Sequence, residues 1–537
     1  MSLDLVRAQA LWGSQGQEVL KNGSVAINGL NNLGIEIIKS LVTLGIDNIY
    51  LFDNIRNERN QKFLDKDMKK GISTAKTLEI MIKECFKEDC NIIHYHTLAN
   101  KTFYDLKPID VIVDCSNNPY NHLMNLEYVN EKKIALFTVC ANKQEGEISF
   151  YSPNHENDCQ PILEDYFENE PGVIISNLLC GITVEEVRKY LFKHNIEKFT
   201  NPILREINDP QRIQANNGLE FEKHDYKETI NKDKLLRRNF YHNLKAEDIF
   251  QRMEKSSIVQ FANNEFRINN KRILVLGAGA IGNYCTLMLS HFSNNEIDFV
   301  DFDCYKKHNI ARQYLAYDSY DKINEDYFNL KYAKSKVLSE KLKIINPNIK
   351  TQGIIGFVGE EYNKSLLKSH KLKESDVTLV NRGWINNNYD IILGCFDNFT
   401  ARYESAKMAF DLKIPYLDGG SSADPTSSSL ITYIPWINDE DISQNFINRE
   451  DKDSIRREKW QRYRNNMNSN LNENDEVFIQ GQSCSDFKSG SVSMGNQIAA
   501  ALMINEMRKV LRPEVYGELI IRRGNYNSNL SKRLSME

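Results

Sequence analysis

An internal repeat constrains the fold of this chain more than any other feature. Ser24–Asn54 reads as an apolar strand, a glycine-containing turn, an apolar helix and a second strand that ends in an acid. Arg272–Asp303 repeats this order. A further apolar strand follows in each copy, at Val111–Asn118 and at Ile391–Asn398. Because a strand, helix, strand unit places its two strands in parallel, the repeat predicts two homologous α/β units, each with a mainly parallel sheet.

Each copy also ends in a helical pattern, which begins at Ser176 in the first copy and at Ser489 in the second. The copies are separated by a charged, partly helical connector, and such charge runs are typical of solvated spacers. We therefore expect a first unit at 1–200, the connector at 201–267, a second unit at 268–440, a helical insert at 441–483, the last part of the second unit at 484–515 and a C-terminal tail at 516–537.

The composition is that of an ordinary globular protein, with 41% hydrophobic and 26% charged residues. No apolar run is long enough to cross a membrane, and the N-terminus lacks the layout of a signal peptide, so we expect a cytoplasmic protein without a membrane partner. The net charge of −5 gives no electrostatic reason to expect nucleic acid binding. The ten cysteines include no CxxC pair, which argues against a zinc site or a disulfide framework.

The turn of the second copy carries the spacing of a phosphate-binding loop. Gly277, Gly279 and Gly282 follow the first strand, and glycines in this pattern let the backbone and a helix N-terminus approach a phosphate. Asp301, at the end of the next strand, is placed to accept a hydrogen bond from a ribose hydroxyl. These residues alone fit a dinucleotide site as well as any other Rossmann-like phosphate site.

The first copy differs at the central glycine of the turn. Asn31 stands there, and its Cβ would obstruct the close approach of a pyrophosphate. The first unit is therefore predicted to bind no nucleotide.

Residues beyond the turn of the second copy favour chemistry on a triphosphate. Asn309, Arg312, Gln313 and Lys334 follow the acid, and Asp397 ends a later apolar strand. A hydride-transfer enzyme has no evident use for such cations, whereas attack at an α-phosphorus builds negative charge that fixed cations and a metal must balance. Asp397 is a natural Mg²⁺ ligand at the carboxyl edge of a parallel sheet.

The second copy resembles the adenylation domain of the superfamily of ubiquitin-activating enzymes, ThiF and MoeB. The resemblance rests on the glycine turn at Gly277–Gly282, on Asp301 and Asp303, on Asn309–Gln313, on Lys334 and the later Asn346 and Pro347, and on Asp397 and Asn398 with Arg402. The start of the chain is similar to the inactive adenylation half of eukaryotic-type activating enzymes, with Arg7 at the position of an entry arginine. The resemblance implies two Rossmann-like adenylation domains, one inactive and one active, in a single-chain pseudo-dimer with a small helical insert.

The resemblance also implies an activity and a set of roles. The C-terminal glycine of a ubiquitin-like protein would attack ATP to give an acyl-adenylate and pyrophosphate. ATP would be bound by Gly277, Gly279, Gly282, Asp301, Asn309, Arg312, Gln313, Lys334 and Asn398, Mg²⁺ by Asp397, and the triphosphate also by Arg7 of the inactive half. Each position also has a purely structural interpretation: Lys334 as a helix-surface lysine, Asp397 as a helix cap and Arg7 as a frayed surface residue.

Ubiquitin activation continues with transfer of the acyl group to a cysteine. No cysteine lies between Cys395 and Cys484, and Cys484 precedes the last helix, as the nucleophile does in compact activating enzymes that this chain resembles. A helix N-terminus or a cation such as Lys488 would favour its thiolate. Cys159 is the second choice, because Cys285, Cys304 and Cys395 fall in segments predicted to be packed. The alternative interpretation of Cys484 is a half-buried structural cysteine.

Four functions remain open. The first is an activating enzyme that forms a thioester and hands the modifier to a conjugating enzyme. The second stops at the adenylate and passes it to sulfur chemistry or an amine, as sulfur-carrier relatives do. The third is a dinucleotide oxidoreductase, and the fourth is a non-catalytic scaffold. The pairing of an inactive and an active copy in one chain favours the first.

Overall fold

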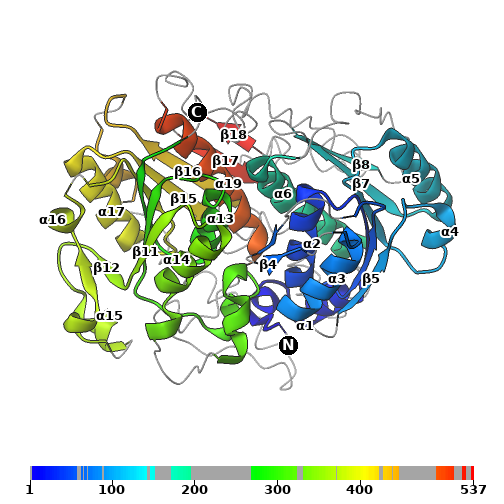
Figure 1. Ribbon diagram of the computed structural model, residues 1–537, viewed down its shortest axis with the longest axis horizontal. Coiled ribbons are helices and arrows are strands. Elements are labelled where there is room, and N and C mark those ends of the chain that lie inside the picture. The colour runs from blue at the N-terminus through cyan, green and yellow to red at the C-terminus, as the bar shows by residue number, and fades with distance from the viewer. Residues whose placement is uncertain are drawn as a thin grey trace, which may run out of the picture. The chain divides into compact units, whose positions relative to one another are not determined.

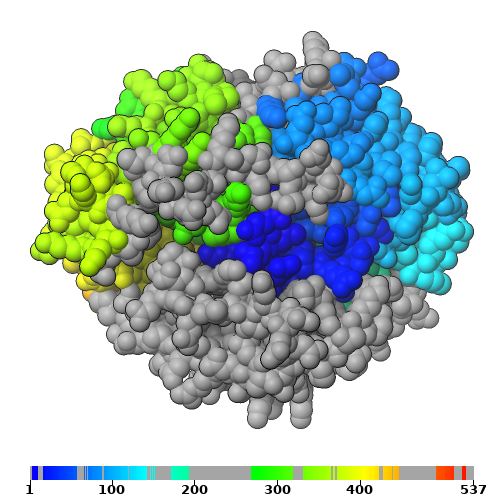
Figure 2. Space-filling view, turned by 90° about the horizontal axis from the view of Figure 1, so that it is seen from below, coloured from blue at the N-terminus to red at the C-terminus, as the bar shows by residue number. Residues whose placement is uncertain are grey.

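The computed structural model describes residues 3–56, 62–64, 66–68, 71–86, 90–141, 146–151, 171–194, 268–322, 330–369, 372–386, 388–421, 427–437, 440–446, 492–512, 523–527 and 534–536. These residues belong to two compact units. The first comprises Met1–Arg267, Val492–Ile498 and Asn527–Ser535, and the second comprises Ile268–Ser491, Ala499–Tyr526 and Met536–Glu537. In Figure 2 the N-terminal unit is blue to cyan and the second unit is green to yellow. The domain boundaries expected from the sequence remain a prediction.

The first unit is built on a six-stranded sheet with the order β5-β2-β1-β6-β7-β8. Figure 1 labels β5, β7 and β8 of this sheet. Its strands are β1 (Ser24–Asn28), β2 (Asn48–Phe52), β5 (Asn91–Tyr95), β6 (Val111–Asp114), β7 (Ala135–Ala141) and β8 (Gly146–Tyr151). All neighbours are parallel except β7 and β8. The helices are α1 (Val6–Asn22), α2 (Asn32–Leu44), α3 (Thr74–Cys85), α4 (Lys101–Tyr104), α5 (Pro119–Lys132) and α6 (Val173–His194), and a short hairpin joins β3 (Lys62–Phe63) to β4 (Lys66–Asp67).

The second unit repeats this plan in a sheet with the order β11-β10-β9-β14-β15-β16-β17-β18. Its strands are β9 (Arg272–Leu276), β10 (Glu296–Val300), β11 (Lys350–Ile354), β14 (Ile391–Gly394), β15 (Tyr416–Ser421), β16 (Ser427–Tyr433), β17 (Arg523–Asn527) and β18 (Leu534–Met536). The strands from β11 to β15 are parallel, and β16 is antiparallel to β15. A separate parallel pair is formed by β12 (Gly356–Val358) and β13 (Thr378–Val380).

The helices of the second unit occupy the same places in the order of elements. They are α13 (Ala280–Leu289), α14 (Lys334–Ile345), α15 (Lys364–Ser369), α16 (Arg382–Ile385), α17 (Phe399–Leu412) and α19 (Ser493–Val510), of which the residues up to Ile498 are assigned to the first unit. Short 3-10 helices are η3 (Lys307–Asn309), η4 (Tyr314–Lys322), η5 (Leu330–Tyr332), η6 (Glu374–Asp376) and η7 (Ile442–Asn445). Both sheets have the strand order of a doubly wound Rossmann-like domain, so the prediction of two such α/β domains is confirmed.

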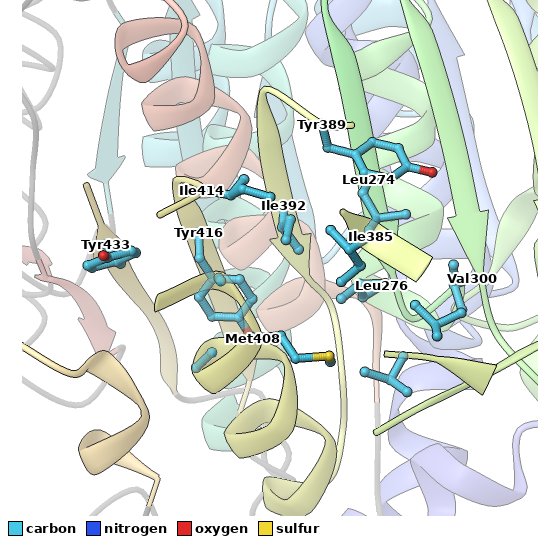
Figure 3. Packing of buried hydrophobic residues seen from close by; sticks show 14 of the residues in the cluster. Leu274, Leu276, Val300, Ile385, Tyr389, Ile392, Met408, Ile414, Tyr416 and Tyr433 are labelled. Carbon is cyan, nitrogen blue, oxygen red and sulfur yellow. The ribbon is translucent and has the colours of Figure 1, made fainter. Parts of the chain in front are cut away.

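A continuous apolar core holds α17 against the second sheet (Figure 3). Leu274, Leu276 and Ile392 come from the central strands, and Met408 comes from α17. Ile442 from η7 belongs to the same buried cluster. The central strands are buried on both faces, as expected for a parallel sheet covered by helices. Catalytic side chains are therefore expected at the carboxyl ends of the strands, where the chain leaves the core.

The same tight turn leaves β1 and β9. Gly29 and Gly277 have φ of +82° and +95°, a conformation that favours glycine. The backbone of the neighbouring strand end passes so closely that a Cβ on Gly277 would lie 2.7 Å from the carbonyl oxygen of Cys395. Gly279 is different, because a Cβ built there would meet nothing within 4 Å.

Substitutions at Gly277 and Gly279 are therefore predicted to differ in their effect on stability. Gly277→Ala should lower the free energy of unfolding by at least about 1–3 kcal/mol, the usual cost of a left-handed non-glycine residue. Gly279→Ala should leave it nearly unchanged. Chemical denaturation of both variants beside the wild type checks this, and equal unfolding midpoints for the two variants would contradict it.

Candidate functional site

The glycine turn of the second unit is held by the carboxylate of Asp301. This residue follows β10, and its Oδ2 accepts a hydrogen bond of 2.8 Å from the backbone N–H of Ala278. Its Oδ1 accepts another from the N–H of Asp303, also at 2.8 Å. Burial raises the pKa of Asp301 to about 6, although the charge of Lys334 and these hydrogen bonds act in the opposite direction. The predicted ribose ligand thus also has a structural role that its sequence position did not reveal.

Gly279 leaves space in front of the helix that follows the turn. It is the N-cap of α13, and no side chain caps the helix there. The first N–H groups of a helix carry partial positive charge and bind anions readily. The turn thus combines open space at Gly279 with a helix N-terminus that has no side-chain cap, and phosphate binding uses this arrangement.

Lys334 lies at the first position of α14, beside the acids that follow β10. Its Nζ is 2.5 Å from Oδ2 of Asp303, and the residue is 9% exposed. Burial acts to lower the pKa of Lys334, but the carboxylates of Asp303, Asp301 and Asp397 more than offset it, so the pKa is raised. Lys334 is consequently a buried, protonated cation and not the helix-surface lysine of the alternative interpretation. The structure brings it close to Asp301 and Asp303, as the predicted site requires.

The segment after Asp303 is compact and buried. Asn309 accepts a hydrogen bond of 2.9 Å from the N–H of Lys306, and Nη1 of Arg312 donates one of 3.1 Å to the carbonyl of His308. The buried Oε1 of Gln313 accepts no hydrogen bond from the described residues. Asn309 and Arg312 are therefore fixed by their own turn, while Gln313 retains an unused acceptor. The assignment of these three residues to ATP stays a prediction.

The end of β14 carries the two remaining predicted residues. Asn398 is the N-cap of α17, and its Oδ1 accepts a hydrogen bond of 2.8 Å from the N–H of Ala401. Asn398, not Asp397, is therefore the helix cap. Its role in ATP binding stays a prediction, and its side-chain oxygen is already engaged by the cap. Asp397 is exposed and acts electrostatically on Lys334.

The residues present fit a magnesium ion that is bound together with a nucleotide. No group of three acidic, histidine or cysteine side chains that could hold a metal occurs among the described residues. Mg²⁺ commonly uses one or two carboxylates and takes its other ligands from phosphates and water. The exposed Asp397 supplies one such carboxylate next to the turn.

The first unit has the same framework with different side chains. Oδ2 of Asp53 accepts a hydrogen bond of 2.7 Å from the N–H of Leu30, as Asp301 does from Ala278. Asn31 replaces the central glycine, caps α2 through the N–H of Gly34 and donates a 2.8 Å hydrogen bond to the carbonyl of Cys115. The space that is open at Gly279 is thus occupied in the first unit by the side chain of Asn31, whose oxygen and nitrogen are both hydrogen-bonded.

The two units also differ in the residues at two further corresponding positions. Thr74 begins α3 where Lys334 begins α14, and their N–H groups bond to corresponding carbonyls. Asn117 follows β6 at the position that Asp397 has after β14. The first unit therefore has neither a lysine at the position of Lys334 nor an acid at the position of Asp397.

The remaining predicted residues belong to the first unit or fall outside the described residues. Arg7 lies in the first turn of α1 and is 7% exposed, so the interpretation as a frayed surface arginine is wrong. Cys484 and Cys159 fall outside the described residues. The eight cysteines that the structure describes are all buried, including Cys285, Cys304 and Cys395. No helix among the described residues is long and apolar enough to cross a membrane.

One ion pair beside Asp397 was not foreseen. Arg402 was part of the sequence motif but had no role, and Asp418 was not singled out. Nη1 of Arg402 is 2.6 Å from Oδ2 of Asp418, and both residues are buried. The acid within β15, opposite the last residue of β14 in the sheet, is the signal from which the pair could have been found.

The raised pKa of Asp301 predicts a specific pH dependence of stability. Between its ordinary pKa of 3.8 and the value of about 6 in the folded protein, the folded state keeps a proton that the unfolded state has released. Raising the pH through this window therefore destabilises the fold. Asp301→Asn removes this effect, so the melting temperature of the variant should rise relative to the wild type from pH 4 to pH 6. A constant difference between the two melting curves across the window would contradict the assignment.

Comparison with known proteins agrees with this architecture. The ThiF family profile matches residues 5–173 and 255–533. The protein named adenylyltransferase and sulfurtransferase MOCS3 in Drosophila persimilis is 32% identical over 146 residues, which are 26% of this chain and 32% of that protein. The MOCS3 protein of Drosophila virilis is 27% identical over 175 residues, or 32% of this chain and 38% of that protein. The matched region spans only about a third of the length of these relatives.

Among solved structures, the crystal structure of SeMet PaaA aligns with a TM-score of 0.33 and 15% identity, over 58% of this chain and 94% of that chain. The family assignment rests on the family profile, which covers well over half of the chain in two segments, one for each copy of the repeat. The protein belongs to the ThiF family, with two Rossmann-like domains in tandem.

Proposed function

We propose that the second unit is an ATP-dependent adenylating domain that activates the C-terminus of a ubiquitin-like protein. The observation that carries this proposal is the buried, protonated Lys334 beside the acids that follow a glycine turn with open space at Gly279. Buried cations close to a phosphate-binding turn stabilise charge that develops on phosphoryl oxygens. A nicotinamide site for hydride transfer has no need of this feature, which disfavours the oxidoreductase.

The proposed reaction follows from the positions of these groups. A terminal glycine carboxylate attacks the α-phosphorus of ATP, the bond from that phosphorus to the bridging oxygen breaks, and pyrophosphate leaves with the bonding electrons. Lys334 and Arg312 stabilise the phosphoryl oxygens, the α13 N-terminus binds phosphate and Asp301 accepts from the ribose. Mg²⁺, held by Asp397 when the nucleotide is bound, would neutralise phosphate charge.

The first unit is proposed to be the inactive half. Asn31, Thr74 and Asn117 stand at the positions of Gly279, Lys334 and Asp397, which supports a unit that binds no nucleotide. Arg7 is proposed to act on the triphosphate, as the resemblance implies. Arg7→Ala should then lower the rate of adenylation, while a scaffold without this role would not be affected.

The chemistry predicts large losses for two substitutions. Lys334→Thr and Asp397→Asn, which install the residues of the first unit, should each slow ATP–pyrophosphate exchange with the cognate modifier about 100- to 1000-fold, the usual effect of removing a group that stabilises developing charge. Lys336→Ala, at an exposed lysine two positions farther along α14, is the matched control and should keep the wild-type rate. Wild-type exchange in the Lys334 and Asp397 variants would overturn the proposal.

The second half-reaction is proposed to be thioester formation on Cys484. The thiolate would attack the acyl carbonyl, AMP would leave, and the thiol proton would pass to solvent. The burial of the eight described cysteines leaves Cys484 and Cys159 as the remaining candidates, and burial raises the pKa of Cys180 to about 12. In the alternative, adenylate-only function, the C-terminal carboxylate of a sulfur carrier or peptide is adenylated, and a sulfur nucleophile or an amine then displaces AMP. The names of the MOCS3 relatives favour this alternative, and the conjugating enzyme belongs to the first proposal alone.

A non-reducing gel distinguishes these two functions. Incubation with ATP, Mg²⁺ and the modifier should give an adduct that thiols reverse, and Cys484→Ala should abolish it while Cys159→Ala keeps it. An adduct that survives Cys484→Ala would transfer the role to another cysteine. Exchange without any adduct in the wild type would favour the adenylate-only function.

A further inference from the structure

The buried guanidinium of Arg402 joins the loop after β14 to the middle of the neighbouring strand β15. Its Nε and Nη2 donate hydrogen bonds of 3.1 and 2.6 Å to the carbonyl oxygen of Phe396, directly after β14. Nη1 donates to Oδ2 of Asp418 in β15 at 2.6 Å, and Nη2 also donates to the carbonyl of Gly419 at 3.0 Å. The side chain of Arg402 thus holds the backbone of both neighbouring segments, at Phe396 after β14 and at Gly419 in β15.

Asp418 is as fully enclosed as its partner. It is 1% exposed, and its Oδ1 accepts a hydrogen bond of 3.1 Å from the hydroxyl of Tyr416, whose ring lies in the apolar core (Figure 3). Gly420 makes room for the pair, because a Cβ there would lie 3.0 Å from Nη1 of Arg402. A buried charge that loses its partner is costly, so Arg402 and Asp418 depend on each other.

This pair acts on the residue that follows Phe396 in the chain, which is Asp397. The side chain of Asp397 is exposed, so its position depends on the backbone around it. That backbone is held by Arg402 at Phe396 and by the helix cap of Asn398 on the other side. The carboxylate is therefore carried by a loop that is fixed at both ends.

The first unit shows what replaces the pair where the acid is absent. Register places Thr138 of β7 opposite Asp114, as Asp418 of β15 lies opposite Gly394. His122 stands in α5 where Arg402 stands in α17, four residues after the capping asparagine. Its Nδ1 is 2.9 Å from Oγ1 of Thr138.

Three charged positions in the second unit are thus changed together in the first. Asp397, Arg402 and Asp418 correspond to Asn117, His122 and Thr138. Burial lowers the pKa of His122, so this replacement is neutral near pH 7. The buried acid of the first unit is Asp114, at the position of Gly394, and it acts electrostatically on His122. The same strand and helix framework therefore forms in the first unit without an arginine–aspartate pair at these positions.

We infer that Arg402 and Asp418 are positioning residues that hold the Asp397 carboxylate where it can share a magnesium ion with the phosphates of ATP. This inference rests on the proposed function of the second unit. Groups that orient a metal ligand through hydrogen bonds typically change metal affinity by 10- to 100-fold when they are lost. Neither residue touches the nucleotide in this account, so their loss affects the metal-dependent part of binding alone.

The test transplants the pair of the first unit into the second. Arg402→His combined with Asp418→Thr gives a neutral pair that this framework already accommodates, and ATP affinity is measured by calorimetry with saturating Mg²⁺ and with a chelator. Wild type should bind ATP more tightly with Mg²⁺. The double variant should lose about 10- to 100-fold of that gain, with its affinity for ATP in the chelator unchanged.

Two further variants complete the experiment. Arg402→Lys keeps a charge opposite Asp418 but cannot form both hydrogen bonds to Phe396, so it should lose the same Mg²⁺-dependent gain. It therefore provides the test if the double variant does not fold. Lys341→Met removes a different ion pair of this unit, 2.8 Å from Asp318, and should keep the wild-type gain.

The outcomes separate this inference from the proposed function. If wild type shows no ATP binding, or no gain from Mg²⁺, the proposed function fails. If Asp397→Asn abolishes the gain but the Arg402 and Asp418 variants retain it, the proposed function stands and the positioning role is overturned. Equal losses of affinity with and without Mg²⁺ would also overturn it, because they would indicate a general structural defect.

Discussion

Both units depend on the close approach of two backbones at the end of the central strand. Gly29 and Gly277 turn the chain in a left-handed conformation directly against the end of the next strand, and no side chain fits between. An acid at the end of the adjacent strand, Asp53 or Asp301, then accepts the N–H of the residue after the glycine. Because this contact is kept in both copies, the turn is first a structural element. Its use for binding depends on the side chains placed around it.

Charge at the carboxyl edge of the sheet distinguishes the second copy, which is proposed to be active, from the first. In the second unit, the buried Lys334 lies among Asp301, Asp303 and Asp397, so its charge is stabilised by acids that would otherwise repel one another. In the first unit the corresponding site carries Thr74 and Asn117, and Asn31 fills the space before the helix. In place of the buried Arg402 and Asp418 it has His122 and Thr138, and the buried Asp114 acts electrostatically on His122. The two units therefore differ in a connected set of charges and not in their framework.

The repeat, the parallel sheets and the turn could be predicted because strand periodicity and glycine spacing are local signals. Lys334 and Asn31 were also found from the sequence. The correspondence of Asn117 with Asp397 was not found from the sequence, because Asp114 also stands near the end of β6. The register places Asp114 opposite Thr138, at the position of Gly394, so Asp114 is not the counterpart of Asp397. The pairing of Arg402 with Asp418 joins a helix to an adjacent strand, so no spacing rule reveals it. The cap formed by Asn398 depends on where α17 begins, which sequence patterns define poorly.

Each chain is proposed to contain one working nucleotide site, in the second unit. Calorimetric titration of the purified protein with ATP and Mg²⁺ tests this most directly, together with Gly279→Asn, which gives the second unit the residue of the first, and Asn31→Gly, which makes the reverse change. One ATP per chain is predicted for wild type and for Asn31→Gly, and none for Gly279→Asn. Two equivalent sites in wild type, or a single site that survives Gly279→Asn, would contradict the account.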